Sequence, residues 1–254
     1  TPHARRGRVA LLSESGTIGG VILDRMGAAG LGVSSFAAIG NRADVSANDL
    51  LQWWDDDPRT DLVLLYLESF GNARKFSRIA RELGRRKPIV AVKSGGAARA
   101  YPSLGADVPS ATVEALLRQT GVVRVDTLAQ LLDVARVLTT QPLPAGRRVA
   151  LVGNGGGSLA LAADACVAAG LVLASLGPDA TGALTAATRV RSGTVDLGFE
   201  ATSDDLERAL RAVLADPAVD SVLVVCAPAP RQPVADLLAA VDAAAREAKD
   251  TPLL

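Results

Sequence analysis

The sequence contains a single histidine, His3, within its 254 residues. A Ser–His–Asp triad and a histidine-ligated metal site both require histidine, so this composition argues against both and we expect no metal site. Cysteine is also scarce. Cys166 and Cys226 both lie in apolar stretches, which favours buried free thiols in a reducing cytoplasm over a disulfide or a metal pair. A cytoplasmic location is therefore expected.

An excess of charge of either sign is missing too. The chain has 27 basic and 27 acidic residues and a formal net charge of +0 at pH 7, which argues against an electrostatic nucleic-acid binder. The densest basic run, Arg85-Arg86-Lys87, is typical of a solvated helix end. No apolar stretch approaches the roughly 18 residues of a membrane-spanning helix, and no secretory signal opens the chain. Membrane and nucleic-acid partners are therefore not expected.

What the sequence does have is one pattern written twice, at residues 9–19 and again at residues 149–159. Each copy is a short apolar strand, a turn of small residues and then a helix. The start of a helix carries unpaired N–H groups and a partial positive charge, and small residues let an anion approach them. The candidate phosphate-binding residues are Ser13, Ser15, Gly16 and Thr17 in the first copy, and Asn154, Gly155, Gly156, Gly157 and Ser158 in the second.

Neither turn is a P-loop or a complete Gly-x-Gly-x-x-Gly fingerprint, so an ordinary strand-to-helix turn explains each one equally well. The duplication favours function. Glu68 follows the apolar strand predicted at residues 62–67 and would face the same sheet edge as the helix starts. It could orient a catalytic base or bind substrate, and a capping or surface carboxylate is an equally good interpretation.

Strand and helix signals alternate along both halves, which predicts doubly wound α/β domains with parallel sheets. In the first half the expected strands are residues 9–12, 33–37, 62–67 and 89–92, and the helices 18–29, 48–56, 73–83, 111–119 and 127–139. In the second half the strands are 149–152, 171–174 and 221–226, and the helices 158–169, 179–187, 203–214 and 234–248. We expect domains at 1–141 and 147–254, a linker at 142–146 and an irregular functional loop at 94–109.

Several motifs together resemble the NDP-forming acyl-CoA synthetase family, which includes succinyl-CoA synthetase. They are Ser13-Glu14-Ser15-Gly16, the segments 40–46, 57–61, 66–71 and 87–95, and, further on, 121–126, 195–197 and 214–217. The resemblance covers essentially the whole chain. It implies two flavodoxin-like, three-layer α/β/α domains with parallel sheets, the second cut short at its C-terminus. Their helix starts would hold a phosphohistidine, and Glu68 would orient it.

The chain departs from the family pattern where the resemblance places that histidine. The loop after Lys93-Ser94-Gly95 reads Ala100-Tyr101-Pro102-Ser103, so Pro102 stands at the histidine position. Proline has no nucleophilic side chain, and we therefore predict a vestigial site with no catalytic residue. Gly193-Thr194 also replaces the family's Asn-Pro before Val195-Asp196, which weakens the second site.

The leading hypothesis is therefore a ligase-like region that has lost its catalytic activity. It would sense or scaffold acyl-CoA within a bacterial protein lysine acetyltransferase. CoA or acyl-CoA and ATP or ADP would belong to the parent protein, with CoA-binding, ATP-grasp and GNAT domains in the same chain and a homo-oligomeric assembly. The first alternative is an active ADP-forming acyl-CoA synthetase component whose histidine is supplied elsewhere. The second is an oligomerisation module. Because Thr1 is no initiator and the last residues, 251–254, begin a strand-like run, we expect a longer parent polypeptide.

Overall fold

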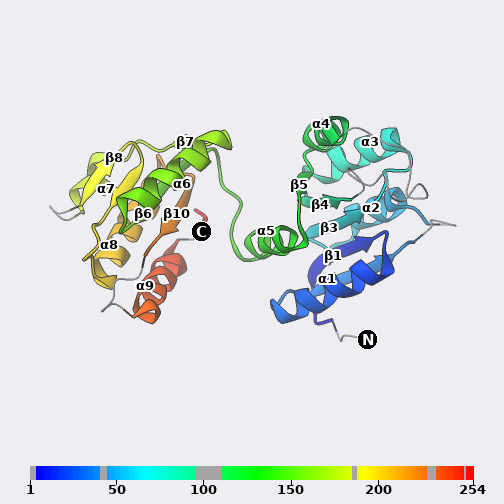
Figure 1. Cartoon of the computed structure of the whole chain (residues 1–254), viewed down its shortest axis with the longest axis horizontal. Coiled ribbons are helices and arrows are strands. Elements are labelled where there is room, and N and C mark those ends of the chain that lie inside the picture. Colours follow the sequence, from blue (N-terminus) through cyan, green and yellow to red (C-terminus); the bar gives the residue numbers. More distant parts are fainter. Residues whose placement is uncertain (1–3, 41–44, 95–109, 185–187, 228–232, 249) are drawn as a thin grey trace. The chain divides into compact units, whose positions relative to one another are not determined.

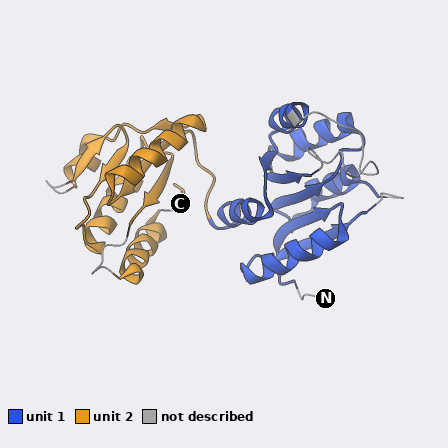
Figure 2. Ribbon diagram, viewed as in Figure 1, with its two compact units in different colours: residues 1–140 blue, residues 141–254 orange. Residues whose placement is uncertain are grey.

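The computed structural model describes residues 4–40, 45–94, 110–184, 188–227, 233–248 and 250–254. The chain forms two compact units, residues 1–140 and 141–254 (Figure 2). Within the described residues no helix is long and apolar enough to cross a membrane. The same part of the chain holds no group of three or more His, Cys, Asp or Glu side chains that could bind a metal ion.

The first unit is built on a five-stranded sheet in which every neighbouring pair is parallel (Figure 1). Its strands are β1 (Arg6–Ser13), β2 (Val33–Ala38), β3 (Leu62–Leu67), β4 (Ile89–Lys93) and β5 (Val123–Val125), in the order β2-β1-β3-β4-β5. The central strands are apolar and buried along most of their length, β1 from Val9 onward, β3 throughout and β4 up to Val92, as expected when helices cover both faces of a sheet. This confirms the α/β fold with a parallel sheet that the sequence predicts.

In the described part of this unit, five helices cover the two faces of the sheet. They are α1 (Gly16–Ala28), α2 (Ala47–Asp56), α3 (Ala73–Leu83), α4 (Ser110–Thr120) and α5 (Leu128–Thr140). The core on one face contains side chains of α2, α3 and α4, and the core on the other contains side chains of α1 and α5. Local signals set the helix starts: Ser15 caps α1, Asn72 caps α3, and Ser46 and Asp49 form a capping box on α2.

The second unit has a mixed sheet, which corrects the expectation of parallel sheets in both halves. Its strands are β6 (Arg148–Gly153), β7 (Val172–Leu173), β8 (Arg189–Arg191), β9 (Thr194–Asp196) and β10 (Ser221–Val225). The order is β10-β6-β9-β8, and β7 also pairs with β6. β8 and β9 form an antiparallel hairpin around Ser192 (φ 44°) and Gly193 (φ 76°). Two successive residues of positive φ make the tight turn whose twist suits a hairpin.

Four helices accompany this sheet: α6 (Gly156–Ala168), α7 (Pro178–Gly182), α8 (Ser203–Leu214) and α9 (Val234–Glu247). Side chains of α8 and α9 share one core, and side chains of α6 pack in the other. The sequence did not predict β5, β8 or β9. α7 is shorter than the helix expected at 179–187, of which residues 185–187 lie outside the described residues. Leu253 pairs in parallel with Val222 of β10.

Candidate functional site

The first candidate site lies at the carboxyl edge of the first sheet, between β1 and β3. The strand order places the topological switch point there, and ligands of open α/β sheets bind in the crevice at that point. Ser13, the last residue of β1, is in register with Tyr66 of β3. The loop that leads into α1 and the loop that leads into α3 therefore begin side by side, as the sequence predicts for Ser13 and Glu68.

The turn between β1 and α1 is fixed by its own serines. Ser13 is fully buried, its hydroxyl donates to the carbonyl of Ser15, and it also accepts the Ser15 N–H at 3.2 Å. Ser15 caps the helix by accepting the N–H of Ile18 at 3.4 Å. Gly16 and Thr17 are exposed, and their N–H groups make no hydrogen bond to any described residue. The serines therefore shape the turn, while Gly16 and Thr17 present the free N–H groups.

Close packing brings this helix start against the sheet. At Gly19 a Cβ would lie 2.9 Å from the ring of Phe36 and 3.0 Å from the Cβ of Ser13. A larger residue at this position would push α1 away from β1 and β2. No acidic residue lies in the first turn of α1, so the partial positive charge of this helix start is not neutralised from within the helix.

Glu14 connects the two loops of this edge. Its carboxylate is 5% exposed, and its Oε2 accepts the backbone N–H of Glu68 at 2.7 Å and that of Ser69 at 2.9 Å. On the other side, the Nζ of Lys93 donates to the carbonyl of Glu68 at 2.7 Å and to that of Ser94. The backbone of Glu68 is thus held at both its N–H and its carbonyl, which leaves its half-buried side chain as the candidate functional group.

The sequence did not predict roles for Glu14 and Lys93, although both lie within the motifs that carry the family resemblance. The available signal was the position of these ionisable residues: Glu14 directly follows a buried strand, and Lys93 is the last residue of another. An unpaired charge at such a position is costly, so a partner for each could have been predicted. Pro102, the predicted position of the missing histidine, lies outside the described residues. Its relation to Glu68 and α1 therefore stays a prediction.

The second candidate site is the start of α6. Asn154 is 3% exposed, and its side-chain amide donates to the carbonyl of Ala227 at 2.7 Å and accepts the Ala227 N–H at 2.8 Å. Asn154 therefore ties the end of β6 to the chain that leaves β10. Ser158 donates its hydroxyl to the carbonyl of Gly155 at 2.8 Å. Both side chains are engaged in shaping the turn.

The glycines of this turn differ in how much room surrounds them. A Cβ at Gly153 would lie 2.0 Å from the carbonyl oxygen of Val225, so the two strands pack too closely there for any other residue. At Gly157 nothing lies within 4 Å. A Cβ at Gly156 would lie 3.0 Å from Oδ2 of Asp196. A carboxylate therefore stands beside the start of α6.

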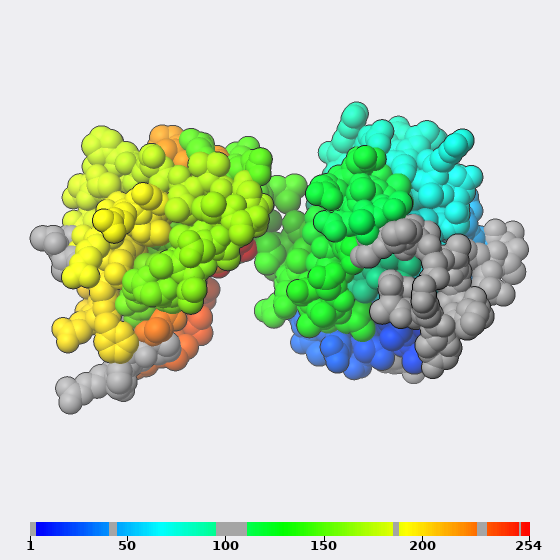
Figure 3. Space-filling model, turned by 45° about the horizontal axis from the view of Figure 1, so that its top comes forward, coloured from blue at the N-terminus to red at the C-terminus, as the bar shows by residue number. Residues whose placement is uncertain are grey.

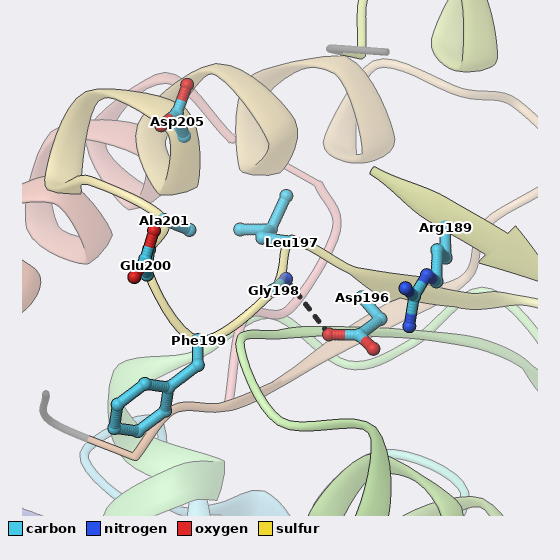
Figure 4. Close-up of a pocket in the computed structure, with 8 residues that line it drawn as sticks. All are labelled: Arg189, Asp196, Leu197, Gly198, Phe199, Glu200, Ala201 and Asp205. Atoms are coloured by element: carbon cyan, nitrogen blue, oxygen red, sulfur yellow. Dashed lines mark hydrogen bonds between the residues drawn. The ribbon is translucent and has the colours of Figure 1, made fainter. Parts of the chain in front are cut away.

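A hollow of about 440 Å³ opens next to Asp196 (Figure 4). It is lined by Arg189, Asp196, Leu197, Gly198, Phe199, Glu200, Ala201 and Asp205. Arg189 and Asp196 face each other in the β8–β9 register, and Asp205 comes from α8 on the opposite side (Figure 4). Asp196 accepts the N–H of Gly198 at 3.0 Å. The sequence did not predict this hollow, because it depends on the unrecognised hairpin.

Comparison with known proteins gives a consistent picture. The chain is 32% identical over 231 residues to acetate–CoA ligase [ADP-forming] II subunit alpha of Pyrococcus furiosus, a match that covers 88% of this chain and 50% of that protein. It is 30% identical over 244 residues to 4-hydroxybutyrate–CoA ligase [ADP-forming] of Nitrosopumilus maritimus, covering 88% of this chain and 33% of that one. The chain thus spans half or less of the length of these relatives.

Among solved structures, the apo form of the dinucleotide forming acetyl-coenzyme A synthetase 1 of Ca. Korarchaeum cryptofilum matches with a TM-score of 0.90 and 26% identity. That match covers 98% of this chain and 56% of the other. The family model described as the succinyl-CoA ligase like flavodoxin domain matches residues 6–138. The chain therefore belongs to the family of the succinyl-CoA ligase like flavodoxin domain.

Proposed function

We propose that this chain is the part of an ADP-forming acyl-CoA synthetase that carries its two ligase-CoA domains. In this proposal both units are flavodoxin-like domains, joined by the linker 142–146. The observation that carries the proposal is the match to ADP-forming ligases along 88% of the chain, which extends over both units. CoA-binding and ATP-grasp domains would complete the enzyme, and the reaction would interconvert an acyl-CoA, ADP and phosphate with the free acid, CoA and ATP.

The start of α1 suits a phosphate group. Gly16 and Thr17 are exposed, their N–H groups have no partner among the described residues, and the first turn contains no acid. These are the features of an anion site at a helix start. At α6 the carboxylate of Asp196 stands beside Gly156 and opposes a second anion. At α1 the Glu14 carboxylate is engaged by the N–H groups of Glu68 and Ser69. We therefore assign phosphate recognition to α1 first, and Glu68, at the same sheet edge, would orient the phosphoryl-carrying group.

The histidine content bears on the choice between the ligase proposal and an acyl-CoA-sensing region. His3 is the single histidine of the sequence, so a phosphohistidine in the loop around Pro102 is not available. In the ligase proposal the phosphoryl-carrying group comes from another domain or subunit. The comparisons favour this ligase interpretation over a regulatory region of an acetyltransferase, because the relatives named above are ligases.

The missing histidine is the observation that favours the second candidate, an acyl-CoA-sensing region without ligase activity. One experiment separates the two. The full polypeptide is incubated with acetyl-CoA or another acyl-CoA, ADP and labelled phosphate, and both ATP and acid-labile phosphoprotein are measured.

Formation of labelled ATP supports the ligase. Calorimetric binding of acetyl-CoA without ATP formation, together with lysine acetylation by the same polypeptide, supports the sensing region and overturns the ligase proposal.

A further inference from the structure

The outer face of α3 and the turn after it carry a row of exposed arginines. They are Arg74, Arg78 and Arg81 in α3, spaced at i, i+4 and i+7, and Arg85, which follows the C-cap Gly84. Residues at this spacing lie on one face of a helix. The opposite face is anchored in the core by Phe76, Ile79, Ala80 and Leu83, all of them buried. The arginine row therefore points away from the unit and cannot turn inward without breaking the core.

These four arginines differ from the other cations nearby. Lys75 pairs with Asp49 at 2.7 Å, and Arg86 pairs with Asp55, in both cases a carboxylate of α2. Among the described residues, none of the four arginines of the row forms an ion pair. Arg74 also lies in the first turn of α3, where the helix dipole disfavours a cation. Arg74 thus carries its charge at a cost to the helix, whereas Arg81, in the last turn, is favoured by the dipole.

The row also borders an open, shallow hollow. A hollow of about 490 Å³ is lined by Arg74, Ser77, Arg78, Arg81, Glu82 and Arg85. Figure 3 shows the cyan surface that includes α3 at the outside of its unit, with side chains standing out from it. The lining thus combines four guanidinium groups with the Ser77 hydroxyl and the Glu82 carboxylate. The guanidinium groups are suited to carboxylates, since guanidinium binds carboxylate with two parallel hydrogen bonds.

We propose that this face of α3 docks an acidic helical segment of a protein partner. The three arginines within α3 span about 10 Å, at 1.5 Å per residue. A partner helix with Asp or Glu at i, i+4 and i+7 presents carboxylates at the same spacing as these three. Glu82, which stands within the row, would accept a basic side chain of that helix. This inference is independent of the ligase chemistry proposed above.

The surroundings argue for a protein over a nucleic acid or an anionic membrane. Glu82 lies among the arginines. A protein helix can meet Glu82 with a basic side chain, whereas a continuous line of phosphates offers it no partner. The whole chain has a formal net charge of +0, so it offers no wider positive field. A narrow basic row that contains one acid matches a protein surface that carries both signs.

The test uses the full chain and a synthetic helical peptide of about 20 residues with Glu at i, i+4 and i+7 and one Lys placed to meet Glu82. Binding is followed by fluorescence anisotropy of the labelled peptide at low and at physiological salt. The test variant is Arg78→Gln/Arg81→Gln. The matched control is Arg25→Gln/Arg136→Gln, which removes the same charge from exposed positions of α1 and α5 in the same unit. Circular dichroism checks that both variants are folded.

We expect the row variant to weaken peptide binding about tenfold and the control variant to change it less than twofold. Raising the salt concentration should weaken the binding of the unchanged chain. A peptide of the same composition in scrambled order should bind at least fivefold more weakly. Equal losses in the two variants, no peptide binding at low salt, or tighter binding of a DNA duplex or of phosphatidylserine vesicles than of the peptide would each overturn the proposal.

Discussion

Replacing Glu14 with alanine tests directly how the candidate site of the first unit is held together. The Glu14 carboxylate accepts two backbone N–H groups, those of Glu68 and Ser69, and is only 5% exposed. Leaving a buried N–H unsatisfied costs about 1–3 kcal/mol. With two such groups, Glu14→Ala should lower the free energy of unfolding by about 2–6 kcal/mol, the sum of two such costs.

Glu14→Gln is the informative comparison, because its carbonyl oxygen can accept both N–H groups without the charge. A hydrogen bond to a charged group contributes about 1 kcal/mol more than a neutral one, so this variant should lose about half as much stability as Glu14→Ala. Glu82→Ala, an exposed glutamate in the same unit, should change stability by less than about 0.5 kcal/mol.

Urea unfolding followed by tryptophan fluorescence is the assay. The two tryptophans of the sequence, Trp53 and Trp54, both lie in α2, so the signal reports on the first unit. Trp54 is fully buried and donates to Ser35 at 2.7 Å, which makes its emission sensitive to unfolding. If Glu14→Ala and Glu82→Ala unfold at the same urea concentration, the assigned role of Glu14 is wrong.

Two predictions concern the second unit. The hydrogen bonds from Arg148 hold the pKa of Asp220 at about 2, below its ordinary value. Because the folded-state pKa is lowered, the ionised Asp220 stabilises the folded state above about pH 4, and this stabilisation is lost as the pH falls toward 2. Asp220→Asn should therefore reduce stability at pH 7 more than at pH 2, and a difference independent of pH in acid-unfolding curves by circular dichroism would contradict this. Gly153→Ala should destabilise by about 1–3 kcal/mol or more, since its Cβ would meet the carbonyl of Val225. Gly157→Ala has open space around it and should raise stability by about 0.5–1 kcal/mol, so equal melting temperatures for the two variants would refute the packing described at Gly153.

The sequence predicts most of the first unit because local and tertiary signals agree there. Apolar runs produce β1, β3 and β4, and the helices predicted at 18–29 and 73–83 correspond to α1 and α3, whose starts are capped by Ser15 and Asn72. The sequence did not predict β5, because this strand has only three residues, one of them an arginine. It is a strand only through its pairing with β4. A pattern that short does not separate a strand from a loop.

The second unit was predicted less well for a similar reason. β8 and β9 are three-residue strands with exposed or partly exposed ends, and the Ser192-Gly193 turn between them was the available hairpin signal. The sequence located helix starts at Ser13–Thr17 and Asn154–Ser158. It did not show which groups each side chain there hydrogen-bonds. Whether Asn154 meets an anion or ties two strands together depends on Ala227, 73 residues later, and local sequence does not carry that information.

The central claim is that α1 presents a phosphate site in an ADP-forming synthetase, and Thr17 tests it most directly. Glu at this exposed first-turn position adds a negative charge that opposes an anion but stabilises the helix by about 0.3–1 kcal/mol. Thr17→Gln is the neutral control of the same size as glutamate. We predict that the full polypeptide forms ATP from acyl-CoA, ADP and phosphate, that Thr17→Glu lowers this rate at least tenfold, and that Thr17→Gln lowers it less than threefold. Equal rates in the two variants, or no ATP formation by the unchanged protein with any acyl-CoA, would contradict the claim.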